Sequence, residues 1–364
     1  MKNKKVIVGL SGGVDSSVAA YLLKNKGYDV TGVTMAIWGG GYDAVPTGKH
    51  SCYGPDEQEE IREAREVAEM LDIPYHVFDC STRYKALVLD YFKSEYLSGR
   101  TPNPCVKCNQ LIKFGMLPEV ARNEGLLFDY FATGHYARVE KDLHSGRFLL
   151  KKAADSKKDQ TYFIYRLSQE QLSTVLLPLG GLTKDEVRKF AAEIDIPLSE
   201  KGESQDFYSG DYKDLLDVQG NPGNIVDSRG KVLGKHEGIW NYTIGQRKGL
   251  GIAFSEPLYV IGLDKENNTV IVGTHEEVMS SAFLVNDLNW ISIDRLRGPM
   301  QVKTRIRSAQ KEAEATLEPI DDTTVKVTFL TPNDGITPGQ SAVFYSDEVV
   351  VGGGTINSVL QNKV

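Results

Sequence analysis

The sequence lacks the features that mark membrane and disulfide-stabilised proteins. No stretch approaches the roughly 18 apolar residues of a membrane span, and Met1 to Lys5 leads into a strand pattern with no apolar signal core. Only 4 of the 364 residues are cysteine, too few for a disulfide scaffold of this length. We therefore expect a cytoplasmic protein that binds no membrane and whose cysteines are reactive or metal-binding.

A strong charge of either sign is also missing. The chain has 42 Lys and Arg against 49 Asp and Glu, a net charge of −7, which excludes indiscriminate attraction to nucleic acid but leaves a local basic surface open. The hydrophobic share of 41% and the charged share of 25% are those of an ordinary folded protein. No internal repeat or low-complexity segment occurs, so we expect two or three domains.

Two common phosphate-binding signatures are absent: the Gly-Lys-Ser/Thr ending of the Walker loop, and Gly-x-Gly-x-x-Gly. In their place, the nearly all-apolar run Lys5 to Leu10 predicts a buried strand, and a turn of glycine and serine leads into an amphipathic helix. The unpaired N–H groups at such a helix start bind anions, and Gly12 and Gly13 allow close backbone approach. Asp15 in this turn suggests a Mg²⁺ ion between its carboxylate and the phosphates.

The turn Ser11-Gly12-Gly13-Val14-Asp15-Ser16 resembles the loop of the PP-loop ATP pyrophosphatases. That resemblance implies an α/β fold of the adenine nucleotide α-hydrolase type, whose members adenylate an oxygen and release pyrophosphate. The residue pattern agrees, because strands at 28–38, 75–80 and 128–136 alternate with helices at 58–71, 84–96, 110–123, 159–173 and 184–194. Such alternation predicts a mostly parallel sheet with ligands at the carboxyl ends of its strands.

The composition changes near Lys201, where short β-type runs separated by Gly, Asp and Asn begin. This change predicts an ATP-binding catalytic domain over 1–203, a small β-rich central domain over 204–278 and a C-terminal β-barrel over 279–364.

Cys105-x-x-Cys108 lies in a proline-stiffened segment that we expect to be a loop just before a helix, a position that lowers a thiol pKa. Three uses compete: half of a zinc site, a redox disulfide, or a sulfur-handling pair that also binds an iron–sulfur cluster. A zinc site would need a second Cys-x-x-Cys or paired histidines, and the sequence has neither.

Several motifs in order closely resemble the bacterial tRNA-specific 2-thiouridylase (MnmA/TrmU) family almost end to end. They are the loop Gly9 to Ser16, Thr101 to Asn109 with Ile112-Lys113-Phe114, Ala132 to Tyr136, Lys158-Asp159-Gln160, and Tyr242 to Gly251.

The resemblance implies the positions of the ligands. ATP would lie against Gly9, Leu10, Ser11, Gly12, Gly13, Val14, Asp15, Ser16, Met35 and Gly134. The target uridine would meet Asn103, Pro104 and Cys105, and tRNA would meet His135, Lys158, Asp159, Gln160, Arg305, Ile306 and Gln340. From the residues alone, alternation in the strand after Gln301 sends Lys303, Arg305 and Arg307 to one face, which predicts a phosphate-contacting ridge.

The chain departs from the family at its second cysteine. Cys105 occupies the usual aspartate position and Cys108 that of the nucleophile, whereas Tyr208 stands where the second cysteine should be. Two routes remain. Cys105 and Cys108 form a persulfide relay, or they ligate a [4Fe-4S] cluster with Cys80, or alternatively Cys52, as third ligand. We favour the cluster slightly, although spacing does not decide.

The predicted reaction is ATP-dependent 2-thiolation of the tRNA wobble uridine. The C2 oxygen is adenylated with Mg²⁺ present, and sulfur at Cys108 then replaces AMP to give 2-thiouridine. The sulfur would come from a cysteine desulfurase, a sulfur carrier or free sulfide. The alternatives are a PP-loop ligase or amidotransferase acting on a small molecule, and a non-catalytic tRNA-binding or redox protein.

Overall fold

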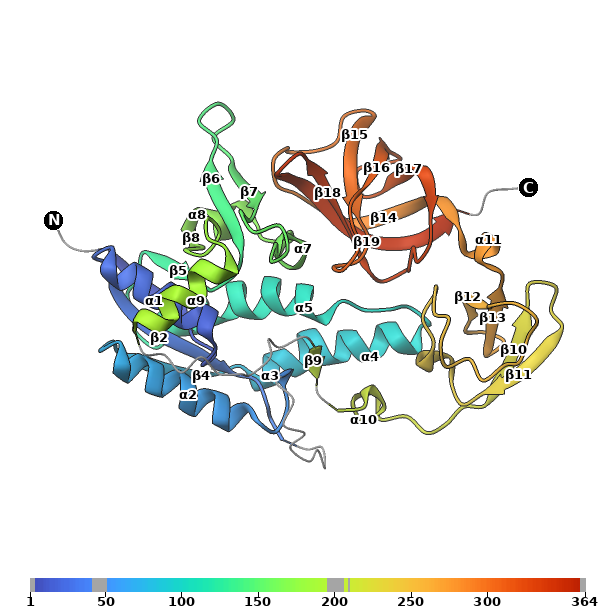
Figure 1. Cartoon of the computed structure of the whole chain (residues 1–364), viewed down its shortest axis with the longest axis horizontal. Coiled ribbons are helices and arrows are strands. Elements are labelled where there is room, and N and C mark those ends of the chain that lie inside the picture. Colours follow the sequence, from blue (N-terminus) through green and yellow to red (C-terminus); the bar gives the residue numbers. More distant parts are fainter. Residues whose placement is uncertain (1–3, 41–50, 195–205, 209, 361–364) are drawn as a thin grey trace. The chain divides into compact units, whose positions relative to one another are not determined.

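The computed structural model describes residues 4–40, 51–194, 206–208 and 210–360 (Figure 1). The segment from Glu203 to Ser209 contains Tyr208, which stands where the resemblance predicts a second cysteine. Tyr208 is described, whereas Glu203, Ser204, Gln205 and Ser209 lie outside the described residues. The chain divides into two compact units. The first comprises Met1–Leu89, Pro104–Leu215 and Glu348–Val350, and the second comprises Asp90–Asn103, Leu216–Asp347 and Val351–Val364.

The first unit contains a five-stranded sheet in the order β4-β2-β1-β5-β8. Its strands are β1 (Lys5–Gly9), β2 (Asp29–Ala36), β4 (Tyr75–Asp79), β5 (Tyr130–Ala132) and β8 (Val175–Leu176), and every pairing is parallel. The strand order runs outward in one direction from β1 through β2 to β4, and in the other from β5 to β8. Such a reversal places a ligand-binding crevice at the carboxyl ends of β1 and β5. The prediction of an open parallel sheet is confirmed.

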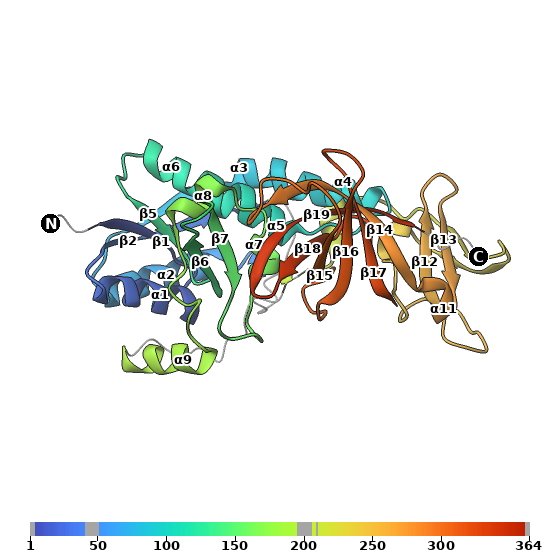
Figure 2. The same cartoon turned by 90° about the horizontal axis from the view of Figure 1, so that it is seen from above.

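Helices cover both faces of this sheet; in Figure 2, α1, α2 and α9 lie below it and α6 lies above it. Apolar side chains of α1 (Val14–Asn25) and α2 (Glu57–Met70) share a core with Val6 and Val8 of β1. The outer helix α9 (Lys184–Glu193) packs on α1 through Val187 and Ala191. Right-handed crossovers between the parallel strands account for α1 and α2 lying on the same face.

The remaining elements of the first unit are short. They are β3 (Ser51–Tyr53), α3 (Ser81–Tyr84), the π-helix η1 (Lys85–Leu89), α5 (Pro104–Lys107), the π-helix η2 (Cys108–Met116), α6 (Leu117–Asn123), the hairpin β6 (Ala137–Lys141) and β7 (Phe148–Lys152), α7 (Thr161–Ile164), α8 (Gln169–Thr174) and β9 (Asp206–Tyr208). The helix predicted over 159–173 is thus two helices, and the parallel pair β3–β9 was not predicted.

The second unit is mainly β-structure. Its central part is a four-stranded sheet in the order β11-β10-β13-β12, formed by β10 (Gly223–Asp227), β11 (Val232–His236), β12 (Tyr259–Asp264) and β13 (Thr269–Gly273), with Ile225, Val260 and Val270 in the core. The unit also contains α4 (Asp90–Leu97), the 3-10 helix η3 (Ile239–Asn241) and α11 (His275–Val278). The helix α10 (Tyr212–Leu216) belongs to the first unit except for its last residue, Leu216.

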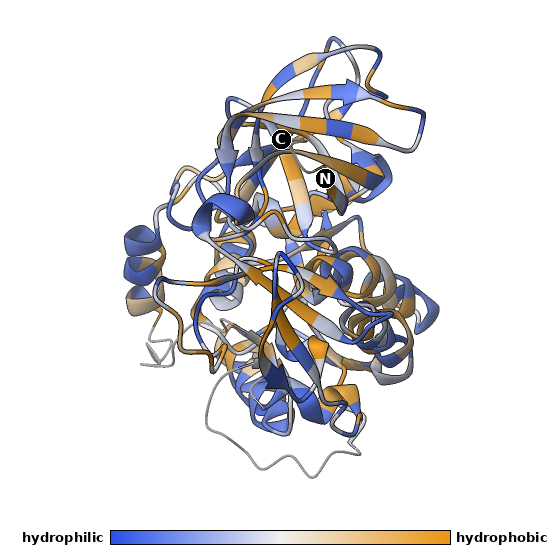
Figure 3. Ribbon diagram, turned by 90° about the vertical axis from the view of Figure 1, so that its right-hand side faces the viewer, coloured by the Kyte–Doolittle hydropathy of each residue, from blue (hydrophilic) through white to orange (hydrophobic). Residues whose placement is uncertain are grey.

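The barrel follows, with strand order β14-β17-β16-β15-β18-β19 closed by pairing of β14 with β19. Its strands are β14 (Ser280–Trp290), β15 (Met300–Arg305), β16 (Ala313–Pro319), β17 (Val325–Asn333), β18 (Ser341–Ser346) and β19 (Val349–Leu360). Apolar and polar residues alternate along these strands (Figure 3), and Phe283, Leu317 and Val327 fill the interior. The predicted C-terminal β-barrel is confirmed. No helix of the described chain is long and apolar enough to cross a membrane.

Candidate active site

The loop after β1 has the geometry of an anion site. Gly12 has φ +73°, and a Cβ there would lie 2.7 Å from the Cβ of Glu63, so only glycine fits. The Ser16 hydroxyl accepts from the Ser11 amide at 3.2 Å and donates to the Gly13 carbonyl at 3.0 Å, which fixes the turn. No side chain caps the start of α1 at Gly13. The first amide N–H groups of α1 therefore remain available to an anion.

A cavity of about 390 Å³ opens beside this loop. Its walls include every residue predicted to bind ATP, from Gly9 to Ser16 together with Met35 and Gly134. A Cβ on Gly134 would lie 2.7 Å from the backbone carbonyl carbon of Asp15, so the end of β5 meets the loop as closely as backbone allows. The structure thus brings these residues together, while their binding of ATP stays a prediction.

Cationic side chains supply the charge that this loop lacks. Among the described residues, three lysines line the cavity, Lys113, Lys158 and Lys184. Residues Gly9 to Ser17 themselves contain no lysine or arginine. Four carboxylates of the described chain, those of Asp15, Glu57, Glu60 and Glu63, line the cavity as well. The positive charge available to a phosphate therefore comes from lysines of distant segments.

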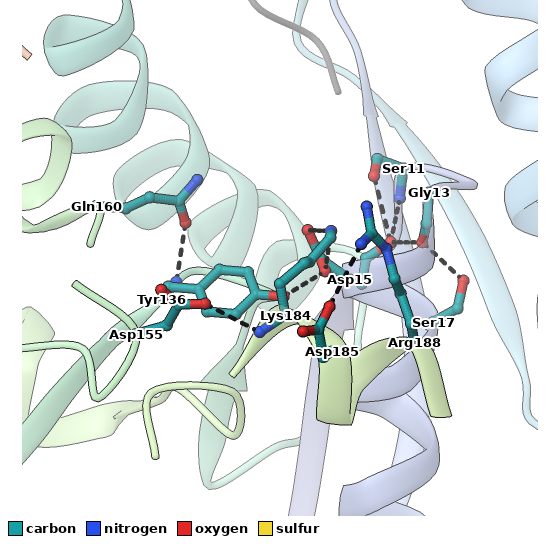
Figure 4. Close-up of polar contacts among 11 residues, drawn as sticks. Ser11, Gly13, Asp15, Ser17, Tyr136, Asp155, Gln160, Lys184, Asp185 and Arg188 are labelled. Atoms are coloured by element: carbon teal, nitrogen blue, oxygen red, sulfur yellow. Dashed lines mark hydrogen bonds and ion pairs between the residues drawn. The ribbon is translucent and has the colours of Figure 1, made fainter. Parts of the chain in front are cut away.

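Asp15 already has two partners (Figure 4). The Lys184 ammonium lies 2.8 Å from both carboxylate oxygens, and the Tyr136 hydroxyl donates to one of them at 2.7 Å. Lys184 was not identified from the sequence, since it lies 169 positions from Asp15. The one local signal was the capping box from Thr183 to Glu186, which marks a helix start but no function.

The two cysteines of the motif lie inside a helix. Cys105 is half-buried in α5, and Cys108 is the first residue of η2 and only 8% exposed. Burial raises the pKa of the Cys108 thiol to about 12, and the charge of Lys113 opposes this only in part. The expectation of a lowered pKa is therefore wrong for Cys108, because desolvation outweighs any effect of the helix start.

The other two cysteines are placed differently. Cys80 is buried at the end of β4, and burial raises its pKa to about 11. Cys52, on β3, is exposed and lines the cavity, although surrounding protein still desolvates the thiolate and raises its pKa. Within the described ranges, no three His, Cys, Asp or Glu side chains could hold a metal ion. The ligand set of Cys105, Cys108 and Cys80, or Cys52 in its place, is therefore not assembled here.

Tyr208 is a packing residue. It is 2% exposed on β9, opposite Tyr53 of β3, and the two ring centroids are 6.2 Å apart. Tyr53 in turn stacks on Tyr84 at 5.3 Å. The position at which the resemblance predicts a second cysteine is thus part of an aromatic cluster.

The residues predicted to meet tRNA in the first unit differ in their surroundings. Lys158, Gln160 and His135 all line the cavity. Gln160 accepts from the Tyr136 amide at 2.8 Å, and Asp159 binds the Thr161 hydroxyl at 2.8 Å, so both hold local structure. The His135 ring contacts the Thr133 hydroxyl at 2.8 Å, and burial holds the pKa of this imidazole well below its usual value.

Two of the three side chains of the predicted basic ridge are bound by other groups of the protein. Arg305 forms an ion pair with Glu312 at 3.0 Å, and Arg307 binds the carbonyls of Ile244 and Gly335. Ile306 is 1% exposed and belongs to the barrel core. Lys303 is exposed as predicted. The alternation was right, but the two arginines bind protein groups.

Gln340 lies next to the loop that carries the predicted uridine contacts. Its side-chain amide donates to the carbonyl of Pro102 at 2.9 Å and to that of Thr101 at 3.3 Å. The Thr101 amide donates to the Pro338 carbonyl at 2.9 Å, and the buried Asn103 follows directly. The structure therefore places Gln340 where it holds the Asn103 segment.

Three family models match the chain. They are described as a tRNA methyl transferase HUP domain over residues 4–208, a tRNA methyl transferase PRC-barrel domain over 213–274, and an aminomethyltransferase beta-barrel domain over 280–356. A relative from Endomicrobium trichonymphae, named tRNA-specific 2-thiouridylase MnmA, is 51% identical over 97% of this chain and 98% of its own. One of the same name from Acetivibrio thermocellus is 46% identical over 98% of this chain and 100% of its own.

A solved structure, described as a predicted subunit of a tRNA methyltransferase from Methanocaldococcus jannaschii, covers 52% of this chain and 75% of its own. It is 17% identical with a TM-score of 0.31, which is too low to carry an argument.

Proposed function

The chain belongs to the tRNA-specific 2-thiouridylase family, and we propose how its own residues perform the reaction. It is a tRNA-uridine 2-sulfurtransferase that uses ATP to replace the C2 oxygen of the wobble uridine by sulfur. The observation that carries the proposal is the cavity beside the phosphate loop, where all predicted ATP contacts meet three lysines.

The first step is adenylation. The C2 oxygen of uridine attacks the α-phosphorus of ATP, the bond to the bridging oxygen breaks, and pyrophosphate leaves with the electron pair. The amide N–H groups at the start of α1 stabilise the charge that develops on phosphate oxygens. Asp15 is the loop carboxylate suited to hold Mg²⁺, since it lines the cavity and its side chain is 28% exposed. When bound, Mg²⁺ supplies further positive charge to the phosphates.

For the sulfur step we propose a relay between Cys105 and Cys108. A persulfide on Cys108 attacks C2 with its outer sulfur, and AMP leaves with the former C2 oxygen. The Cys105 thiolate then attacks the Cys108 sulfur, which forms a Cys105–Cys108 disulfide and leaves 2-thiouridine with the electron pair. An external dithiol reduces the disulfide. Positions three apart on one helix lie on the same face, so the two thiols are neighbours.

The sequence favoured a [4Fe-4S] cluster instead, but the described residues do not fit one, since no third ligand joins the pair. We derive no step through a cluster. The relay requires a sulfur donor that carries persulfide, of the cysteine desulfurase or sulfur carrier class, rather than free sulfide.

The substrate contacts stay proposals. We propose that the tRNA contacts the catalytic domain (1–203), the central domain (204–278) and the barrel (279–364) in the cytoplasm. The wobble base would be flipped toward Asn103 and Pro104, because a stacked base cannot reach a recessed site.

One experiment separates the steps. We expect Cys108→Ser to release pyrophosphate in the presence of ATP and unmodified tRNA but to form no 2-thiouridine. Cys80→Ser serves as the matched control and should retain thiolation, because Cys80 has no role in the relay. Thiolation by Cys108→Ser would refute the assignment. Pyrophosphate release without tRNA would favour a small-molecule ligase, and no release at all a non-catalytic tRNA-binding protein.

The same preparations test the relay against the cluster. Wild-type protein purified without oxygen should be colourless and free of iron, and should thiolate with a persulfide donor. Iron and inorganic sulfide in stoichiometric amounts, lost in Cys80→Ser, would overturn the relay.

A further inference from the structure

Lys184 is the first residue of α9, and its side chain lines the cavity and reaches the phosphate loop. The ammonium bridges both carboxylate oxygens of Asp15 at 2.8 Å, and the side chain is 12% exposed (Figure 4). It also lies 5.8 Å from the centre of the Tyr136 ring. A cation is therefore held at the loop that was predicted to bind phosphates.

The backbone at Lys184 is fixed independently of this ion pair. Its amide donates to the Asp155 carboxylate at 3.1 Å, and a complete capping box joins Thr183 to Glu186. The start of α9 thus stays in place whatever the side chain binds. A lysine has a flexible four-carbon stem and a compact charge, so its ammonium can change partners without backbone movement.

A purely structural role does not explain the position. The helices α1 and α9 already share an apolar core that includes Val18, Ala19, Val187 and Ala191. The side chains of the ion pair are only 12% and 28% exposed, and a mostly buried ion pair stabilises a fold no better than an apolar pair of similar size. An ion pair on the wall of a cavity for a polyanion, beside a loop with no cation of its own, instead suggests a ligand-binding role.

We propose that Lys184 is the cation of the phosphate loop, which leaves Asp15 when ATP binds and takes hold of the β- and γ-phosphates. This inference rests on the proposed function and deepens it. During adenylation the electron pair of the broken bond passes to the bridging oxygen, and the Lys184 ammonium stabilises the departing pyrophosphate without proton transfer. The exchange also releases Asp15, which keeps the hydrogen bond from Tyr136.

The test compares Lys184→Met, which keeps the stem and removes the charge, with Lys184→Arg, which keeps the charge. Lys189→Met is the matched control, since Lys189 is exposed on the same helix. Equilibrium binding of ATP and of AMP is measured for the full-length protein, together with tRNA affinity, melting temperature and single-turnover pyrophosphate release.

We expect Lys184→Met to weaken ATP binding by about 10- to 100-fold, the loss of one charge-assisted contact. AMP affinity should stay at the wild-type value, because AMP has no β- or γ-phosphate, and tRNA affinity should stay there too. The melting temperature should fall, because Asp15 loses its cation in a mostly buried site. Lys184→Arg should recover part of the ATP affinity, and Lys189→Met should match the wild type.

Equal losses for ATP and AMP would show that Lys184 only shapes the loop, and unchanged ATP binding would show that it does not meet the nucleotide. Either result overturns the proposal. Failure of the proposed function would look different: wild-type protein would release no pyrophosphate with tRNA, while the ratio of ATP to AMP affinity would still report on Lys184.

Discussion

Replacing Gln340 by Ala distinguishes a residue that positions the uridine loop from one that touches RNA. The family resemblance implies contact with tRNA, whereas in the structure the side-chain amide donates to the carbonyls of Thr101 and Pro102. Each hydrogen bond contributes a net ~1 kcal/mol, so the variant loses about 2 kcal/mol of loop ordering. That corresponds to a roughly 30-fold fall in the equilibrium constant for ordering the Asn103 segment, which is the upper limit for the fall in its ordered population.

The assay is single-turnover pyrophosphate release at saturating ATP and tRNA, with the tRNA dissociation constant measured separately. We expect the saturated rate of Gln340→Ala to fall by up to roughly 30-fold, while tRNA affinity stays near the wild-type value. The bond from the Thr101 amide to Pro338 survives in the variant and limits the loss.

Gln301→Ala is the matched control. This exposed glutamine of β15 donates to Thr316 at 3.0 Å, and its loss should change neither quantity. Gln340→Glu should be at least as slow as Gln340→Ala, because a carboxylate cannot donate to the two carbonyls. An unchanged saturated rate with a much weaker tRNA complex would refute the reasoning and assign Gln340 to RNA contact.

Three further predictions concern the first unit. Burial raises the pKa of Cys108 to about 12, so the thiolate fraction should rise about tenfold per pH unit between pH 7 and 9. The rate of alkylation by iodoacetamide, followed by mass spectrometry, should rise in the same proportion. A rate that does not change with pH would contradict this. Gly134→Ala would place a Cβ 2.7 Å from the carbonyl carbon of Asp15. We therefore expect this variant to lose about 1–3 kcal/mol in unfolding free energy and to show no detectable ATP binding by calorimetry. The control Gly181→Ala, whose added Cβ would have no atom within 4 Å, should behave as wild type. Burial keeps the pKa of His135 well below its usual value, so its ring proton resonances should not titrate between pH 6 and 8, and a midpoint in that range would disprove the buried neutral ring.

Local patterns were sufficient to predict the parallel sheet, the phosphate loop and the barrel. An apolar strand, a glycine turn and a helix start lie within a dozen residues at the phosphate loop, and in the barrel alternation repeats along each strand. The prediction of a loop at Cys105 was wrong because proline is tolerated at the first helical position, where its missing N–H costs nothing. The chain is therefore helical from Pro104, and Cys108 is desolvated inside that helix.

Contacts between distant segments were beyond prediction. The partners of Asp15 are Tyr136, from the segment between β5 and β6, and Lys184 of α9, and the partners of Arg307 are the carbonyls of Ile244 and Gly335. Charge alternation shows which face an arginine occupies but not whether a carbonyl or a carboxylate already binds it. The same limit applied to Tyr208, whose aromatic neighbours depend on a strand pairing with no turn signal.

The grouping of Asp90–Asn103 with the barrel has a consequence for how the protein is made. The guanidinium of Arg100 donates to the backbone carbonyls of Ile356 and Asn357, some 256 positions later in the chain. A ribosome therefore completes the ATP cavity long before the segment that receives the uridine finds its permanent partners. A prematurely terminated chain should bind ATP but should not use it to adenylate tRNA. The enzyme therefore becomes active only once β19, the last strand to be synthesised, has formed.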